Sequence, residues 1–98
     1  MIAKRMRLVR RETYAHDLDR IVEYIAKDNP VAALAMWDEI EGQVERLRDF
    51  PLSGRSGRVP ETRELVVAGT AYIVIYVVGD DVDLVRVLHG AQKWPPNP

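Results

Sequence analysis

The amino-acid sequence predicts a single α+β domain with the element order βααβββ, in which an antiparallel sheet packs on an N-terminal two-helix hairpin. Apolar side chains recur at helical spacing between residues 13 and 49, whereas residues 62–89 form three β-rich segments separated by turn residues. The chain has 98 residues, enough for one hydrophobic core and too few for two. We therefore treat residues 1–98 as one domain, with residues 90–98 as a proline-rich tail.

The first strand and the first helix follow from alternation and spacing. Met6 and Leu8 alternate with arginines, which predicts a short strand over residues 4–10. Thr13 is a suitable N-cap for the helix that follows. That helix carries one apolar stripe, formed by Leu18, Ile21, Val22 and Ile25.

The second helix is predicted to begin at Pro30 and to run to about Asp49. Asn29 can cap it, and proline at the first helical position loses no hydrogen bond. The short link makes the two helices an antiparallel hairpin. Gly42 lowers helix propensity, so we expect it to mark a close contact between the helices. The stripe of this helix is formed by Trp37, Ile40, Val44 and Leu47.

Three strands are predicted after a Gly/Pro/Ser-rich loop at residues 51–61. They cover about residues 62–67, 71–78 and 82–89, with turns at residues 68–70 and 79–81. The Gly-Asp sequence of the second turn is typical of a hairpin.

The middle strand of these three is apolar on both faces. Tyr72, Val74, Tyr76 and Val78 alternate with Ile73, Ile75 and Val77. Because one helical hairpin covers one face of a sheet, the other face is expected to stay open and to display the tyrosines. Either a partner covers that face, or the C-terminal tail folds back over it with Trp94.

Charge is nearly balanced in total but segregated along the chain. The formal net charge is −1, which argues against a protein built mainly to coat nucleic acid. Residues 1–11 contain five basic and no acidic side chains, whereas residues 12–49 contain ten acidic and four basic ones. One interpretation is an acidic helical layer compensated by a basic strand. The other is a basic face that binds a polyanion or an acidic partner.

Several classes of protein are excluded or disfavoured by composition. The chain has no cysteine, which excludes disulfides, thiolate zinc sites and a cysteine nucleophile. The longest uncharged stretch, residues 65–79, is too short for a membrane helix, and the basic start lacks a signal-peptide core. No histidine or carboxylate spacing resembles a metal site. We expect a soluble cytoplasmic protein with no cofactor and no metal.

Arg86 and His89 are the most suggestive polar residues of the sheet half. Arg86 lies between two valines, so it should either pair with Glu64 or Asp83 or clamp a phosphate or carboxylate. Strand alternation places Leu84, Arg86 and Leu88 on one face and Val85, Val87 and His89 on the other. A bulge or a bend near Gly90 would be needed to present Arg86 and His89 to one substrate.

A series of short motifs resembles the RelE/ParE superfamily of toxins from bacterial type II toxin–antitoxin modules. The resemblance spans about residues 3–95, in order and with similar spacing. The motifs are Thr13-x-Ala15-x-Asp17-Leu18-x-x-Ile21-x-x-Tyr24-Ile25-Ala26, Asp28-Asn29-Pro30, Phe50-Pro51-x-x-Gly54-Arg55, Arg63-Glu64-Leu65, Tyr72-x-Val74-x-Tyr76 and Arg86-Val87-Leu88-His89-Gly90-Ala91-Gln92-x-Trp94-Pro95.

The resemblance implies a small growth-inhibiting toxin, of a kind also linked to plasmid stabilization, that is neutralised by a cognate antitoxin in a hetero-oligomer. In this superfamily the antitoxin's C-terminal segment folds onto apolar surface near the sheet. We expect its contacts at Tyr72, Val74 and Tyr76. The expected contacts with the toxin's target are Arg55, Arg58 and Trp94.

The superfamily has two branches with different targets. ParE-like members inhibit DNA gyrase, and we favour this branch because the chain is slightly acidic. RelE-like members cleave mRNA on the ribosome. In that alternative Arg63 and Arg86 would stabilise the charged phosphate, His89 would be the general acid or base, and the RNA 2′-hydroxyl would be the nucleophile without a metal. A second alternative is an inactive module that only binds its antitoxin.

Overall fold

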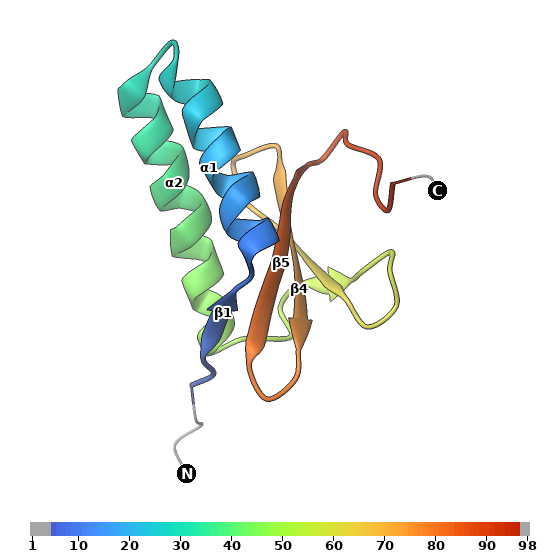
Figure 1. Cartoon of the computed structure of the whole chain (residues 1–98). Helices are drawn as coiled ribbons and strands as arrows, with labels where there is room; N and C mark the ends of the chain where they lie inside the picture. The colour runs from blue at the N-terminus through green and yellow to red at the C-terminus, as the bar shows by residue number, and fades with distance from the viewer. Residues whose placement is uncertain (1–4, 97–98) are drawn as a thin grey trace.

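In the computed structural model, which describes residues 5–96, the chain forms two helices and a five-stranded sheet. Figure 1 shows both helices on one face of the sheet. The α+β class and the helical hairpin predicted from the sequence are confirmed. The elements in chain order are β1 (Leu8–Arg10), α1 (Glu12–Ala26), α2 (Pro30–Glu45), a 3₁₀ turn (Arg46–Arg48), β2 (Arg55–Ser56), β3 (Arg63–Val66), β4 (Tyr72–Val78) and β5 (Val82–His89).

The strands lie in the order β1-β5-β4-β3-β2, and the sheet is mixed. Strands β3 to β5 pair antiparallel as predicted, but β1 runs parallel to β5, with Leu8 opposite Val82. The predicted loop at residues 51–61 contains a further short strand, β2, which pairs with β3 at the sheet edge. The prediction of an entirely antiparallel sheet is therefore wrong, because β1 pairs in parallel with β5.

The first strand is shorter than the predicted residues 4–10. Residue 4 lies outside the described residues, and β1 begins only at Leu8. The backbone N–H of Met6 donates to the carbonyl of Arg48 at 2.9 Å instead of to a strand neighbour. Alternation alone cannot distinguish such a segment from a paired strand.

The helix starts follow the capping rules in one case and not in the other. The side-chain oxygen of Asn29 accepts a hydrogen bond from the backbone N–H of Ala32 at 3.0 Å, and Pro30 opens α2, as predicted. Helix α1, however, begins at Glu12, before the predicted cap Thr13. The Thr13 hydroxyl donates instead to the carbonyl of Val85 in β5. A tertiary contact has replaced the local cap.

The end of α2 also differs from the prediction. The α-helix stops at Glu45 and tightens into the 3₁₀ turn, so it ends before Asp49. Gly42 makes no close helix contact, because a Cβ atom placed there would meet nothing within 4 Å. The expectation of a tight glycine-mediated crossing is wrong.

The main core lies between the helices and the sheet, and it includes the tyrosine-bearing face of β4. Val74 and Tyr76 are fully buried against helix residues such as Leu18 and Ile40, and Tyr72 is half-buried at the edge of this core. The expected display of tyrosines on an open face is therefore wrong, and Val74 and Tyr76 offer no surface to an antitoxin. Periodicity identified residues that share a face, but not which face the helices cover.

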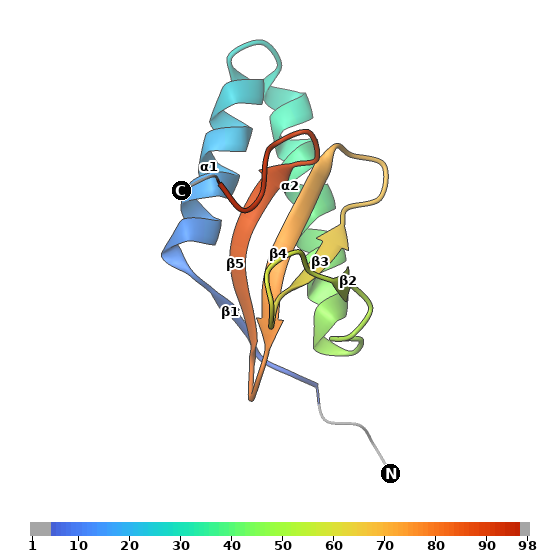
Figure 2. The same cartoon turned by 90° about the vertical axis from the view of Figure 1, so that its right-hand side faces the viewer.

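The opposite face of the sheet is covered by the C-terminal tail. Ile73, Ile75 and Leu88 are buried in a second, smaller cluster with Val85 and Trp94 packed against it. In Figure 1 the tail lies on the side of the sheet away from the helices, and Figure 2 shows it from that side. Of the two predicted coverings, the folded-back tail is the one that the structure contains.

The basic N-terminal segment is neutralised by acidic side chains. Arg10 bonds Glu41 of α2 at 2.6 Å, so part of the charge of the helical layer is balanced by β1. The other described arginines of this segment form the pairs Arg5–Asp49, Arg7–Asp81 and Arg11–Asp83. These pairs support the interpretation of a compensating basic strand. No helix among residues 5–96 is long and apolar enough to cross a membrane.

The Tyr76 hydroxyl should contribute measurably to stability. It accepts a hydrogen bond from the N–H of Gly54 at 2.9 Å and donates to the carbonyl of Pro51 at 2.8 Å. Gly54 approaches so closely that a Cβ atom there would lie 2.5 Å from this oxygen. Tyr76→Phe should leave both backbone groups unpaired and lower the free energy of unfolding by about 2 kcal/mol in urea denaturation.

The matched control for this prediction is Tyr24→Phe, because the Tyr24 side chain is 73% exposed. It should leave the urea midpoint unchanged. Equal midpoints for Tyr76→Phe and Tyr24→Phe would show that water replaces both lost hydrogen bonds.

Candidate functional site

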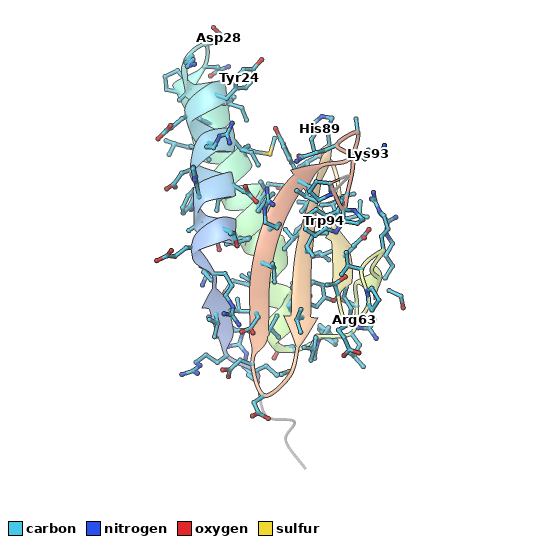
Figure 3. All side chains as sticks on the ribbon, turned by 45° about the vertical axis from the view of Figure 1, so that its right-hand side comes forward. Tyr24, Asp28, Arg63, His89, Lys93 and Trp94 are labelled. Carbon is cyan, nitrogen blue, oxygen red and sulfur yellow. The ribbon has the colours of Figure 1, made fainter. Side chains whose placement is uncertain are left out.

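A pocket of about 330 Å³ lies between α1, the end of β5 and the beginning of the tail. Three of the residues predicted to have a functional role line it, namely Tyr72, Arg86 and His89. Figure 3 shows Tyr24 of α1 and His89 at the same end of the molecule. The remaining lining residues are Asp17, Arg20, Ile21, Tyr24, Val87 and Gln92.

Asp17 binds Arg86 and the backbone of β5 at this pocket. The Arg86 guanidinium donates to both carboxylate oxygens, at 2.6 and 3.2 Å, and the N–H of Val87 donates to the same carboxylate at 3.0 Å. The hydrogen bond to Asp17 raises the pKa of Arg86, although burial opposes this. Strand β1 ends at Arg10, so it does not pair with the second half of β5. There the Thr13 and Asp17 side chains of α1 bond the backbone of β5 at Val85 and Val87.

The predicted partners of Arg86 are therefore wrong. Asp83 bonds Arg11 at 2.7 Å, and Glu64 is bound by Arg55 and Arg58 instead. Asp17 is 69 residues away in sequence, and as an acidic residue in the first turns of a helix it has an ordinary local explanation. Only the packing of α1 beside β5 identifies it as the partner.

A bulge in β5 changes the predicted alternation of its side chains. Ile75 pairs with Arg86 and Tyr76 pairs with Leu84, which leaves Val85 without an opposite residue. Leu84 and Val87 consequently both belong to the core beneath the helices, contrary to the predicted faces. The bulge lies at Val85 and not near Gly90.

Arg86 and His89 reach the same pocket although they leave the strand on opposite sides. Arg86 pairs across the sheet with Ile75 of the tail-covered face, but its guanidinium extends round the strand edge to Asp17 on α1. His89 pairs with Tyr72, and the two rings meet edge to face at 5.7 Å. Its Nδ1 accepts a hydrogen bond from the N–H of Ala91 at 3.1 Å, which places the proton of the neutral ring on Nε2.

Arg63 is not part of this pocket. It pairs with Tyr76 on β4, whereas His89 pairs with Tyr72, so four residues of strand, roughly 13 Å, separate the two rows. Its guanidinium donates to the carbonyls of Leu52 and Gly54 at 3.3 and 2.8 Å. Figure 3 shows Arg63 and His89 well apart along the sheet. Of the predicted nuclease set, Arg86 and His89 share the pocket, and only Arg63 lies apart from it.

The predicted target-binding arginines surround a buried carboxylate. Glu64 is 1% exposed, and it accepts hydrogen bonds from the Arg55 guanidinium at 2.8 Å and from the backbone N–H of Arg58 at 3.0 Å. Burial by itself would raise the pKa of Glu64, but these hydrogen bonds and the two arginine charges outweigh it and lower the pKa. The arginine side chains remain about half exposed, so they can still contact another molecule.

Trp94 packs on the tail-covered face of the sheet, where it contacts Arg86. The Arg86 guanidinium carbon is 5.7 Å from the centre of the indole ring, and the indole N–H is buried without a hydrogen-bond partner among the described residues. Arg86 therefore connects α1, β5 and the tail. Among residues 5–96, no cluster of three or more histidine, aspartate or glutamate side chains is arranged to hold a metal ion.

Sequence reasoning missed several residues of these sites. Arg20 and Tyr24 line the pocket from α1, and Tyr24 lies within one of the superfamily-like motifs. The sequence predicts Glu64 as a partner for Arg86 and as part of the motif Arg63-Glu64-Leu65, but not as the carboxylate that binds Arg55 and Arg58. Its pairing with Arg55 and Arg58 could have been suspected, because Glu64 lies in a predicted strand directly after the loop that contains both arginines.

The fold, with its two-helix hairpin and mixed sheet, is that of the RelE/ParE class of small toxins. The family model described as the ParE toxin of the type II toxin–antitoxin system parDE matches residues 8–94. The chain therefore belongs to the ParE toxin family of type II toxin–antitoxin systems.

Similar proteins agree with this assignment. The protein named "Putative toxin Y4kP" from Sinorhizobium fredii is 45% identical over 78 residues, which cover 80% of this chain and 81% of that protein. Toxin RelE2 from Caulobacter vibrioides is 35% identical over 77 residues, with 78% and 85% covered. A solved structure of the chromosomal ParDE system from P. aeruginosa superimposes with a TM-score of 0.80 at 25% identity, covering 89% of this chain and 98% of that one.

Proposed function

We propose that this ParE-family toxin arrests growth in the cytoplasm by inhibiting DNA gyrase and that the antitoxin of its module neutralises it. The observation that favours this target over RNA is the separation of Arg63 from His89. A nuclease would need these groups around one scissile phosphate. Here backbone carbonyls hold the Arg63 guanidinium four residues of strand away from His89, and the charge of Arg86 is paired with Asp17.

Target contacts are proposed at Arg55, Arg58 and Trp94. The two arginines keep exposed guanidinium surface while Glu64 fixes their loop, which is a preorganised basic surface. Trp94 is half-buried at the tail on the other sheet face from the helices. An antitoxin contact at Tyr72 is retained in the proposal, because Tyr72 borders the pocket beside α1.

Purified toxin should block supercoiling by gyrase, and induced expression should arrest growth with a DNA-damage response. His89→Gln should keep this toxicity within a few-fold, because gyrase inhibition needs no proton transfer from an imidazole. In a nuclease the same substitution would remove general acid–base catalysis and reduce activity by about 10²-fold or more.

Two outcomes would contradict the gyrase proposal. Undisturbed supercoiling in the presence of pure toxin, together with new 5′ ends on translated messages by primer extension, would establish the ribosome-dependent endoribonuclease instead. Normal growth at high levels of folded protein would indicate a module that only binds antitoxin. The relative named Toxin RelE2 makes the primer-extension arm necessary.

A further inference from the structure

The pocket between α1, the end of β5 and the tail has the size of a small-molecule site. Its volume of about 330 Å³ lies at the lower end of the range of ligand pockets, and side chains from several segments of the chain line it. The proposed contacts with gyrase use none of its charged groups. The hydrogen bonds of these groups indicate which ligand the pocket can hold.

Hydrogen-bond donors outnumber free acceptors among the charged and imidazole groups of this pocket. The Asp17 carboxylate already accepts two hydrogen bonds from Arg86 and one from the N–H of Val87. The Nδ1 of His89 already accepts from the N–H of Ala91, so the ring offers only its Nε2–H. The Arg86 guanidinium uses its Nε and Nη2 for Asp17, which leaves the N–H groups of Nη1. A ligand with acceptor oxygens is therefore favoured over a ligand that donates.

Arg20 supplies the unbalanced positive charge of the pocket. Its side chain lines the pocket from α1, is exposed, and forms no ion pair within residues 5–96. The charged lining residues are Arg20, Arg86 and Asp17, so their formal charges sum to +1. A monoanion balances this charge, whereas a dianion would leave excess negative charge beside Asp17. A guanidinium also matches a carboxylate with two parallel hydrogen bonds.

Apolar surface beside these donors suits the body of an organic acid. Ile21 and Val87 line the pocket together with Tyr24 and Tyr72. The Tyr24 side chain is 73% exposed, so most of it lies in water. An apolar ligand body would remove part of this aromatic ring from water, which is favourable.

We propose that this pocket binds a small organic monocarboxylate with an apolar body. The carboxylate binds Arg20 and the Nε2–H of His89, and the body packs against Tyr24 and Ile21. Arg86, fixed by Asp17, adds one further donor. The inference does not depend on whether gyrase is the target, because neither Arg20 nor Tyr24 belongs to the proposed target contacts.

Four small probes test the pocket in the full chain by nitrogen-15 NMR titration at pH 7.5. They are 3-phenylpropionate, its uncharged amide, acetate and 2-phenylethyl phosphate. 3-Phenylpropionate should shift the backbone N–H signal of Val87, which bonds Asp17 at the pocket. It should bind about 10-fold more tightly than the amide, which cannot form charge-assisted hydrogen bonds, and about 10-fold more tightly than acetate, which lacks the ring. The phosphate is mostly a dianion at this pH and should bind more weakly than 3-phenylpropionate.

Variants separate the charged part of the pocket from the apolar part. Arg20→Gln should weaken 3-phenylpropionate about 10-fold, whereas Arg46→Gln, at an exposed arginine of the 3₁₀ turn, should change its affinity by less than about 2-fold. His89→Phe keeps an aromatic ring but removes the Nε2–H, so it should weaken binding about 5-fold. Tyr24→Ala should remove most of the preference for 3-phenylpropionate over acetate while acetate binds as before.

Four results would overturn the proposal. Equal affinity for 3-phenylpropionate and its amide would show that the pocket has no anion site. Tighter binding of 2-phenylethyl phosphate would show that the pocket takes a phosphate group instead of a carboxylate. Equal weakening by Arg20→Gln and Arg46→Gln would mean non-specific attraction to basic side chains. The absence of a shift at Val87 with every probe would remove the site.

Discussion

Replacing Asp17 by alanine is expected to lower the free energy of unfolding by about 3 kcal/mol, because it leaves a partly buried arginine without its partner. The carboxylate accepts two hydrogen bonds from Arg86 and one from the backbone of Val87. The Asp17 and Arg86 side chains are only 15% and 29% exposed, so water can replace these hydrogen bonds only in part. The loss should appear as a lower urea midpoint, with no change in the slope m of the free energy of unfolding against urea concentration.

The control is Asp19→Ala on the same helix, where the side chain is exposed and has no ion pair within the described residues. Its free energy of unfolding should stay within about 0.5 kcal/mol of that of the unchanged protein. A double-mutant cycle with Arg86→Met isolates the pair itself. If Asp17→Ala costs no more than Asp19→Ala, the Asp17–Arg86 pair does not hold β5 to α1.

Glu64→Gln is the second large expected change, with a loss of about 2 kcal/mol at pH 7. Glu64 is the only charged residue among the described ones that is fully buried, and it binds both Arg55 and Arg58. The glutamine keeps the shape of the side chain but not its charge. The loop between β2 and β3 should therefore be held more weakly at neutral pH.

The same substitution predicts a dependence on pH with a definite sign. The pKa of Glu64 is lower in the folded chain than its ordinary value, so the folded state favours the ionised carboxylate. Its stabilising contribution is complete above the unfolded pKa of about 4.3 and is lost as the pH falls through the folded pKa. The difference in stability between the unchanged chain and Glu64→Gln should be constant from pH 6 to 8 and shrink below about pH 4.

Urea titrations between pH 3 and pH 8 measure this difference. Glu23→Gln, at an exposed position on α1, serves as the control and should give a small difference at every pH. A difference between Glu64→Gln and the unchanged chain that grows toward low pH would mean that burial dominates and that the carboxylate is destabilising. A difference independent of pH would mean that charge is irrelevant at this position.

The elements were predictable where local chemistry determines them. Asn29 and Pro30 define the start of α2, and the alternation of residues 72–78 defines β4. Predictions were wrong where a residue with a local structural preference forms a hydrogen bond with a segment far away in the sequence instead. Thr13 bonds a carbonyl of β5 instead of capping α1, and the backbone of Met6 bonds Arg48 instead of a strand. Such contacts depend on segments that are far apart in sequence.

The candidate site was predictable in its residue types but not in its geometry. Arg86 and His89 were identified from the sequence, yet the pocket that contains them depends on the bulge at Val85 and on Asp17 of α1. A bulge inserts one residue without changing the apolar character of the strand, so periodicity does not reveal it. The real partner of Arg86 could not be selected among fifteen acidic residues by sequence alone.

The sequence by itself determined the α+β class, the order of the helices and strands, and the superfamily motifs, because these depend on spacing between near neighbours. Only the tertiary structure decided that the tyrosine face of β4 lies under the helices, that the tail covers the opposite face, and that Arg63 lies apart from His89. The physical reason is that burial and pairing are properties of contacts between distant segments. Alternation distinguishes the two faces of a strand, but the packing of the helices decides which one becomes the core.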